Sequence, residues 1–273
     1  MEIGANTRLL VILGDPVGHS LSPSMHNAAI RALGLDAAYL AMRTTADTLP
    51  VVLQALAAVG AAGNVTVPHK QATERYVTRK TELCARVGAC NTFWTEHGAM
   101  VGDNTDVSGV RAAVHALGAD GAGRWLVLGT GGSARAVAIA AGGAQARLLV
   151  RSRDPGRARA FVDWASAHDI AARVAAATEP CDLVINTTPL GLKEGDPLPI
   201  SPTQLNGARA ALDLTYAAGE TPWVRTLRAA GIAACDGREV LLHQGAAAFT
   251  RFFPGEEPPL DVMRAAVARA LRV

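Results

Sequence analysis

Short aliphatic runs alternate along the chain with longer amphipathic stretches, and this pattern is typical of α/β proteins. In the first part, residues 8–13, 37–42 and 64–67 read as strands, and residues 91–102 as a hairpin that turns at His97-Gly98. Apolar residues spaced by three and four predict helices through residues 25–33, 48–59 and 68–77. Gly34 and Gly60 end the first two of these helices.

A second series of elements begins after Asp106. It opens with a helix over 107–118. Buried strands are predicted at 124–129, 146–150, 182–186, 211–216 and 231–235. Helices are predicted at 133–143 and 157–168. From Arg238 onward the pattern is helical again. We therefore predict an N-terminal α/β domain (1–106 plus 240–273) and a Rossmann-like dinucleotide domain (107–239), with the C-terminal helices packing back on the first domain.

Composition narrows the class of protein. The chain has 273 residues, of which 49% are hydrophobic and 18% charged, enough for a sizeable core. A net charge of +2, spread along the chain, gives no reason to expect a nucleic-acid or membrane partner. Four dispersed cysteines argue against a disulfide framework or a metal site. Without a basic leader or a long apolar run, we expect a soluble, cytoplasmic protein, either a monomer or a homodimer.

A glycine motif marks the start of the second domain's first helix. The segment WLVLGTGGSARA places Gly129, Gly131, Gly132, Ser133 and Ala134 between a predicted strand and a predicted helix. Glycines in this context allow a tight turn and a close approach of a pyrophosphate, while the helix N-terminus offers free N–H groups. An ordinary tight turn is the alternative, but the flanking elements favour a dinucleotide site.

The end of the following strand bears on which dinucleotide binds. A carboxylate there binds the ribose of NAD, whereas arginine suits the 2′-phosphate of NADP. Here the strand runs into Arg151, Ser152 and Arg153, with Arg157 a turn later, so NADP is favoured. Asp154 leaves a role for NAD open, because a shifted loop could bring it to the ribose.

Polar residues also gather at element boundaries in the first domain. Ser22 occupies a predicted N-cap position and Pro23 follows it in the first helical turn. Ser20 lies two residues before Ser22, so both hydroxyls can point to the same side of the helix start. Two hydroxyls at a helix N-terminus suit a carboxylate, although simple capping explains them as well.

Three further segments carry candidate chemistry. In GNVTVPHK, a strand would place Asn64 and Thr66 on one face and the two valines on the other, while Lys70 would begin a helix, an unfavourable place for a cation. Asp106 in GDNTD is either a helix cap or a functional carboxylate. Asn91 in GACNT has a similar position at the entry to a strand.

Together these segments resemble the shikimate dehydrogenase family. The motifs that carry the resemblance occur in the family's order along essentially the whole chain: SLSP, NVTVPHK, GACNT, GDNTD, GTGGSARA, INTTPLG, LDLTY and HQGAAAF. The resemblance implies a substrate domain, an NADP domain and reversible reduction of 3-dehydroshikimate to shikimate, a step of the shikimate pathway to chorismate and the aromatic amino acids. The cofactor loop departs from the family's Asn-Arg-Thr, and Glu239 and Val240 replace a usual glycine and methionine.

The resemblance also implies roles for individual residues. Lys70 and Asp106 correspond to the catalytic pair, and Ser20 and Ser22 to the ligands of the substrate carboxylate. The remaining implied contacts are Asn64, Thr66, Asn91, Tyr216 and Gln244 with substrate, and Thr188, Gly191 and Gly237 with cofactor. Quinate and aminoshikimate dehydrogenases share these features and stay open as alternatives. A non-catalytic module that senses dinucleotide and shikimate is a third possibility, and such a module could dispense with Lys70 and Asp106.

Overall fold

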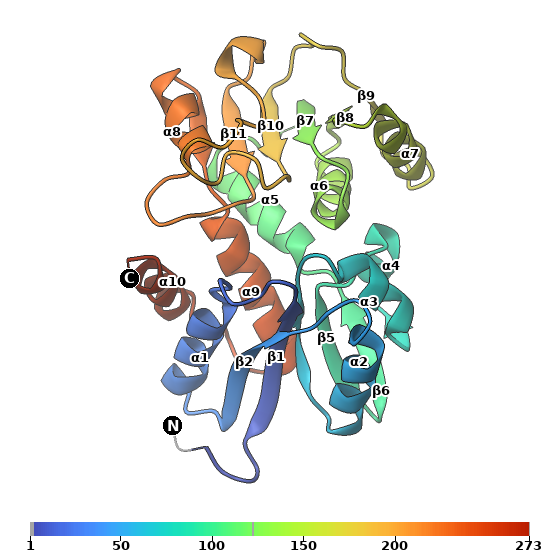
Figure 1. Ribbon diagram of the computed structural model, residues 1–273, viewed down its shortest axis with the longest axis vertical. Coiled ribbons are helices and arrows are strands. Elements are labelled where there is room, and N and C mark those ends of the chain that lie inside the picture. Colours follow the sequence, from blue (N-terminus) through green and yellow to red (C-terminus); the bar gives the residue numbers. More distant parts are fainter. Residues whose placement is uncertain (1–2, 122, 273) are drawn as a thin grey trace. The chain divides into compact units, whose positions relative to one another are not determined.

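The computed structural model describes residues 3–121 and 123–272. The chain forms two compact units: unit 1 comprises Met1–Asp106 and Leu241–Val273, and unit 2 comprises Val107–Val240 (Figure 1). Each unit contains one six-stranded sheet, and the α/β prediction is confirmed. Among the helices formed by the described residues, none is both long and apolar enough to cross a bilayer.

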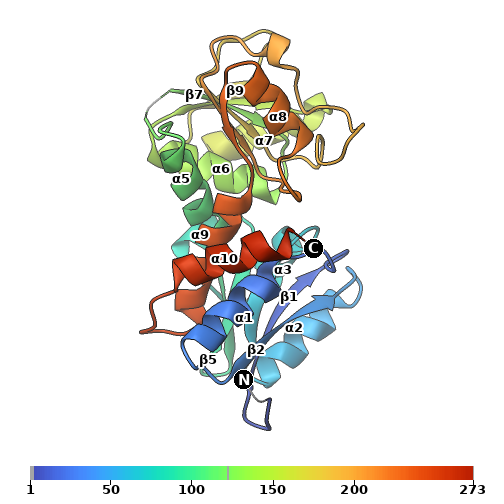
Figure 2. The same ribbon diagram turned by 90° about the vertical axis from the view of Figure 1, so that its left-hand side faces the viewer.

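Unit 1 contains a mixed sheet in the order β2-β1-β3-β5-β6-β4. Its strands are β1 (Arg8–Gly14), β2 (Ala37–Arg43), β3 (Ala62–Val65), β4 (Arg79–Lys80), β5 (Thr92–Glu96) and β6 (Ala99–Asp103). Its helices are α1 (Ser22–Ala32), α2 (Leu49–Ala58), α3 (Lys70–Tyr76), α4 (Glu82–Val87), α10 (Leu260–Ala270) and most of α9 (Arg238–Phe252). Helix α10 packs alongside α1, as Figure 2 shows.

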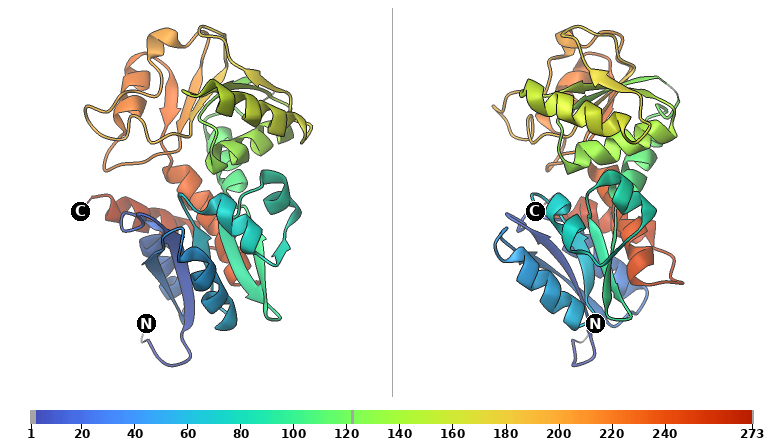
Figure 3. Two further views of the ribbon diagram at one scale, coloured as in Figure 1. Left: turned by 45° about the vertical axis from the view of Figure 1, so that its right-hand side comes forward. Right: turned by 90° about the vertical axis from the view of Figure 1, so that its right-hand side faces the viewer.

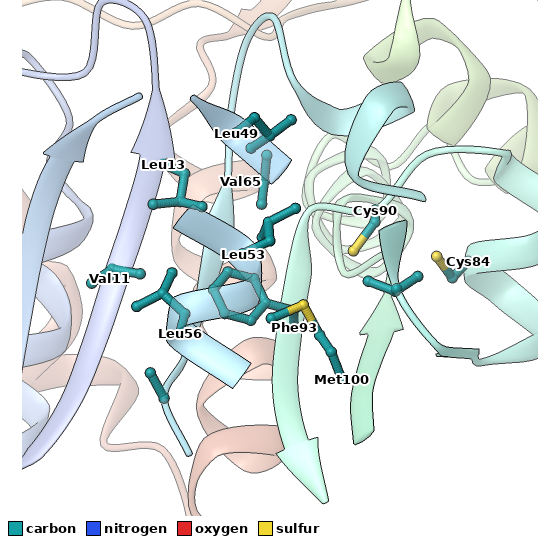
Figure 4. Packing of buried hydrophobic residues seen from close by; sticks show 12 residues of the cluster. Val11, Leu13, Leu49, Leu53, Leu56, Val65, Cys84, Cys90, Phe93 and Met100 are labelled. Atoms are coloured by element: carbon teal, nitrogen blue, oxygen red, sulfur yellow. The ribbon is translucent and has the colours of Figure 1, made fainter. Parts of the chain in front are cut away.

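One face of this sheet is apolar and is covered by α2. Leu49, Leu53 and Leu56 follow one another at helical spacing and pack on strand residues that include Val11 and Phe93 (Figure 4). Because side chains alternate along a strand, Leu10 and Ile12 belong to the opposite face. That opposite face carries the polar groups described below.

The predicted strand over 64–67 is wrong in its extent. Strand β3 ends at Val65, and Thr66 follows it outside the sheet. Val65 is buried whereas Val67 is 65% exposed, so the two valines do not share a buried face. Pro68 explains the early end, since proline cannot donate to a ladder and restricts the residue before it.

Unit 2 contains a parallel sheet in the order β12-β11-β10-β7-β8-β9. Its strands are β7 (Arg124–Leu128), β8 (Arg147–Arg151), β9 (Ala172–Val174), β10 (Leu183–Asn186), β11 (Ala210–Asp213) and β12 (Ala233–Cys235). Its helices are α5 (Asp106–Ala116), α6 (Gly132–Gly143), α7 (Pro155–Ser166), α8 (Pro222–Ala229) and the 3-10 turn η1 (Pro202–Gln204). Figure 3 shows α6 and α7, in yellow-green tones, against the sheet, where they contact β7, β8 and β9.

The central strands β7, β8, β10 and β11 are largely buried on both faces, as is usual for a parallel sheet. The strand register aligns Leu126, Leu149 and Val184, and Trp223 of α8 packs in the same core. The chain leaves β7 towards β8 on one side and later returns to β10 on the other. Adjacent β7 and β10 therefore form a topological switch point, where doubly wound sheets bind ligands beyond the carboxyl ends of their strands.

Candidate active site

Lys70 and Asp106 meet in unit 1 although they lie far apart in the sequence. Lys70 is the first residue of α3 and Asp106 the first of α5. The Lys70 Nζ atom lies 2.5 Å from Asp106 Oδ2, and the two side chains are only 15% and 12% exposed. A charged pair so shielded from water is strongly coupled, and loss of either partner would leave an uncompensated charge. The second Asp106 oxygen accepts from Asn91, so this carboxylate has partners other than the helix it begins.

The Asn91 side chain holds the carboxylate from its other side. Its Nδ2 donates to Asp106 Oδ1 at 2.8 Å and to Thr105 Oγ1 at 3.0 Å. Its Oδ1 accepts from the Thr105 backbone N–H at 2.7 Å and from Thr92 Oγ1 at 3.0 Å. These contacts fix the amide orientation, and Asn91 is buried. A buried amide with donor and acceptor both bound is a rigid support for the carboxylate.

The strand register places a row of polar residues on the sheet face opposite α2. Leu10 pairs with Tyr39 and Ile12 with Asn64, so these two polar residues share a face. Thr92 lies opposite Asn64, and Asp103 lies opposite Thr92. Tyr39, Asn64, Thr92 and Asp103 therefore lie on one face of the sheet, on β2, β3, β5 and β6, with β1 between the first two, and the row leads towards Asp106.

Asn64 uses its whole side-chain amide within this row. Its Oδ1 accepts from the Tyr39 hydroxyl at 2.7 Å. Its Nδ2 donates to the Asn91 carbonyl at 3.1 Å and to Thr92 Oγ1 at 3.0 Å. Asn64 thus lies next to Asn91, and the polar side-chain atoms of Asn64 are hydrogen-bonded to other protein groups.

Gln244 reaches the same cluster from α9. Its Oε1 accepts from Asn91 Nδ2 at 3.4 Å, and its Nε2 donates to the Leu241 carbonyl at 2.9 Å. Unit 1 therefore gathers Lys70, Asn91, Asp106 and Gln244 from four parts of the chain.

The two serines lie at the start of α1, but not as the sequence predicts. Ser22 is the first residue of the helix and Leu21 precedes it as N-cap, so the N-cap prediction for Ser22 is wrong. Ser20 Oγ accepts from the Ser22 backbone N–H at 3.3 Å and takes over part of the capping. Ser22 is buried, while Ser20 is half-buried. Thr66, half-buried, lies just beyond β3, with its backbone N–H bound to the Leu13 carbonyl.

The glycine motif of unit 2 forms the turn from β7 to α6. Gly129 has a φ of +111°, and a side chain there would meet Thr187 Oγ1 at 2.5 Å, so only glycine fits. Around Gly131, the N-cap of α6, a Cβ would find open space. Gly132 and Ser133 form the first turn of α6, and Ala134 is buried. The loop leaves room for a group to approach the helix N-terminus.

The arginines after β8 have different surroundings. Arg151 Nη2 donates to the carbonyls of Ala176 and Ala177, each at 2.8 Å, and so ties β8 to the loop after β9. Arg153 and Arg157 are exposed. Asp154 is the N-cap of α7, accepting from the backbone N–H groups of Gly156 and Arg157, which explains a carboxylate at this position.

Ser152 lies between these arginines, and its Oγ accepts from the Asp154 backbone N–H at 3.3 Å. It is half-buried, in the loop that joins β8 to α7.

The loops after β10 and β11 are joined by a buried carboxylate. Asp213 Oδ1 accepts from Asn186 Nδ2 and from the Thr215 backbone N–H, both at 3.0 Å, and Oδ2 accepts from Thr221 Oγ1 at 2.9 Å. Burial raises the pKa of Asp213, against the smaller lowering by these hydrogen bonds. Asn186 Oδ1 in turn accepts from both the backbone N–H and the hydroxyl of Thr188.

Three other predicted residues lie in or beside these loops. Gly191 has a φ of +75°, and a Cβ there would lie 2.8 Å from Pro199 Cδ, so packing alone requires glycine. Gly237 donates its N–H to the Thr215 carbonyl at 2.9 Å, and a Cβ there would lie 2.4 Å from the Leu214 carbonyl oxygen. Tyr216 is half-buried beside Thr215.

Comparison with known proteins decides the family. The domain described as the shikimate dehydrogenase substrate-binding domain matches residues 12–93, and the shikimate 5'-dehydrogenase C-terminal domain matches residues 237–268. A curated shikimate dehydrogenase (NADP(+)) from Moorella thermoacetica is 38% identical over 99% of this chain and 96% of its own length. The chain belongs to the shikimate dehydrogenase family.

Solved structures of the family share this fold. The shikimate 5-dehydrogenase of Thermus thermophilus, in complex with NADP(H) and shikimate, is 34% identical with a TM-score of 0.86, covering 97% of this chain and 100% of that one. The Listeria monocytogenes enzyme, in complex with shikimate and NAD, is 27% identical with a TM-score of 0.86, covering 97% and 98%.

Four further polar residues support these sites, and three of them, Thr92, Asn186 and Asp213, lie within the motifs GACNT, INTTPLG and LDLTY without a role having been assigned to them. Tyr39 and Thr92 belong to the row that supports Asn91, and Asn186 and Asp213 support the loops of unit 2. A signal was present for two of them: Tyr39 is the one polar side chain in the run AAYLAM, and Asp213 lies within the apolar run ALDL. Buried hydroxyl and carboxyl groups need partners, so such isolated polar residues indicate a network.

Proposed function

We propose that this chain is an NADP-dependent shikimate dehydrogenase that reversibly reduces 3-dehydroshikimate to shikimate, with Lys70 and Asp106 as its catalytic pair. The observation that carries the proposal is the contact between Lys70 Nζ and Asp106 Oδ2, shielded from water and braced by Asn91. Membership of the family supports the reaction, and the contact supplies groups able to move the proton that it needs.

The chemistry requires a proton transfer at the reacting oxygen. When the ketone is reduced, Lys70 in its ammonium form would donate a proton to the developing alkoxide. In the reverse direction the neutral amine would take the hydroxyl proton back. Asp106 holds Nζ in place through Oδ2, while Asn91 holds Asp106 through Oδ1, so the donor is oriented before substrate arrives. The nicotinamide supplies or accepts the hydride when bound.

The substrate carboxylate would bind at the start of α1, where Ser20 and Ser22 place hydroxyls beside backbone N–H groups. Thr66, Asn91, Gln244 and Tyr216 are proposed ligands of the ring hydroxyls. The Asn64 side-chain amide is hydrogen-bonded to protein groups. We therefore propose that Asn64 supports Asn91 and does not contact the substrate directly.

Unit 2 fits a dinucleotide. The open space at Gly131 and the start of α6 suit a pyrophosphate, with Gly132, Ser133 and Ala134 in the first turn. Because the Arg151 guanidinium is bound to two carbonyls, we assign the 2′-phosphate to Arg153 and Arg157, together with Ser152. Thr188, Gly191 and Gly237 would border the nicotinamide end.

The decisive experiment is an initial-rate panel of shikimate, quinate and aminoshikimate, each with NADP+ and with NAD+, followed by absorbance of the reduced cofactor. We expect the highest kcat/KM for shikimate with NADP+. A higher value for quinate or aminoshikimate would assign the chain to that activity. Binding of shikimate and NADP+ without turnover of any substrate would contradict the enzyme and favour a sensing module.

A further inference from the structure

The Tyr39 hydroxyl begins the buried polar row that leads to the proposed catalytic pair. Tyr39 is fully buried in β2. Its hydroxyl donates to Asn64 Oδ1 at 2.7 Å. One phenolic oxygen thus binds the side chain from which the polar row leads to Asn91 and Asp106.

The path from Tyr39 to Asp106 is continuous. Asn64 Nδ2 donates to the Asn91 backbone carbonyl at 3.1 Å. The Asn91 side chain then donates from Nδ2 to Asp106 Oδ1 at 2.8 Å. Thr92 reinforces the path, since its hydroxyl bonds both Asn64 and Asn91. Removal of the first donor would leave Asn64 Oδ1 without that partner and free the amide to rotate, which would disturb the orientation of Asn91.

Tyr39 itself is held firmly. The Asn27 side chain binds both backbone groups of Tyr39, accepting from its N–H at 2.9 Å and donating to its carbonyl at 2.8 Å. The His26 ring stacks on the Tyr39 ring with centroids 4.5 Å apart and planes 13° apart. Burial raises the pKa of the Tyr39 phenol well above its ordinary value, so the group keeps its proton and stays a donor. A packing role alone would not require this arrangement of its polar atom.

We propose that the Tyr39 hydroxyl is a positioning group that holds the Asn64–Asn91 support of Asp106 in its orientation. The inference rests on the proposed function. Asn91 is itself a proposed ligand of the substrate ring, so a shift of this support would move both a substrate contact and the catalytic carboxylate. A small misplacement of a catalytic group costs a large factor in rate.

The test compares Tyr39→Phe with Tyr76→Phe in steady-state shikimate oxidation. Tyr39→Phe removes one oxygen and keeps the ring against His26, whereas Tyr76, half exposed at the end of α3, is a matched control in the same unit. We expect Tyr39→Phe to lower kcat about tenfold, the effect of one lost buried hydrogen bond, and to raise the KM for shikimate several-fold. The KM for NADP+ should not change, and Tyr76→Phe should match the wild type in all three constants.

Several outcomes are distinguishable. If wild-type protein does not oxidise shikimate, the proposed function fails. If the wild type is active and Tyr39→Phe lowers only the thermal midpoint, with kcat and KM unchanged, Tyr39 is a packing residue and the inference is overturned.

A second variant breaks the path at its next step. Asn64→Ala should produce the same division between kcat and KM, and the double variant with Tyr39→Phe should lose little more than Asn64→Ala alone. Fully additive losses would show that Tyr39 does not act through Asn64. Far-UV circular dichroism of each variant confirms that folded protein is being assayed, and if Tyr39→Phe does not fold, Asn64→Ala carries the test.

Discussion

The stability of unit 1 is expected to fall at acidic pH because of His26. Its ring is fully buried between Tyr39, Phe249 and Phe252. Within the described residues, neither ring nitrogen has a hydrogen-bond partner. Burial lowers the pKa of His26 to about 3, because an imidazolium there would lose its hydration. The native ring is therefore neutral, while the same ring in the unfolded chain is protonated below about pH 6.5.

The sign and size of the effect follow from proton linkage. The native pKa is depressed, so the stability that depends on a neutral His26 is fully present above about pH 6.5 and is lost as pH falls towards 3. Between pH 7 and pH 5 the free energy of unfolding falls by about 2 kcal/mol. Below the pKa of His26 in the unfolded chain, protonation stabilises the unfolded state by about 1.4 kcal/mol per pH unit. Any native pKa below about 4 gives the same loss at pH 5, so the magnitude depends mainly on the unfolded chain.

The assay is urea unfolding at pH 7 and pH 5 for the wild type, His26→Phe and His19→Phe. His26→Phe retains an aromatic ring against Tyr39 but cannot titrate, so its free energy of unfolding should fall about 2 kcal/mol less than that of the wild type. His19 is exposed, and its variant should follow the wild type. The comparison uses the difference between two pH values, so a packing cost of the larger ring cancels. Equal acid sensitivity of His26→Phe and the wild type would show that His26 is not the source of this pH dependence.

Two further predictions concern unit 2. Burial raises the pKa of Asp213, so as pH rises from about 4 towards 7 wild-type thermal stability should fall relative to Asp213→Asn; a difference in midpoint that does not change with pH would contradict this. Arg153→Ala should raise the KM for NADP+ about tenfold or more and leave the KM for NAD+ unchanged, because one charge-assisted contact to phosphate is lost. The exposed Arg159→Ala is its control, and equal effects of Arg153→Ala on both cofactors would remove Arg153 from the phosphate site.

The sequence predicts the elements with clear periodicity and misses the short ones. Strands β1, β2 and β7 and helices α2, α6 and α10 follow from apolar spacing. Strand β4 has only two residues, both exposed, so no period could reveal it. Helices α4 and α8 are short as well, although Thr81 and Thr221, which cap them, are residue types that favour a helix start.

The sequence predicts the site residues more readily than their partners. Motifs single out Lys70, Asp106 and Asn91, but the distances between them depend on strand pairing, which a sequence does not contain. The role of Arg151 illustrates the limit, because charge alone does not tell an arginine that binds phosphate from one that binds backbone carbonyls. Asn64 is similar, since its engagement by Tyr39 follows only from the register of β1 with β2 and β3.

Shikimate turnover by Lys70→Ala tests the catalytic role of Lys70, with Lys80→Ala as the matched control in unit 1. Lys80 is ion-paired with Glu74 and lies outside the proposed machinery. If Lys70 transfers the proton, Lys70→Ala should reduce kcat at least about a hundredfold while circular dichroism and the Kd for NADP+ stay near wild-type values. Lys80→Ala should turn over normally. A folded Lys70→Ala protein that oxidises shikimate at the wild-type rate would contradict the assignment.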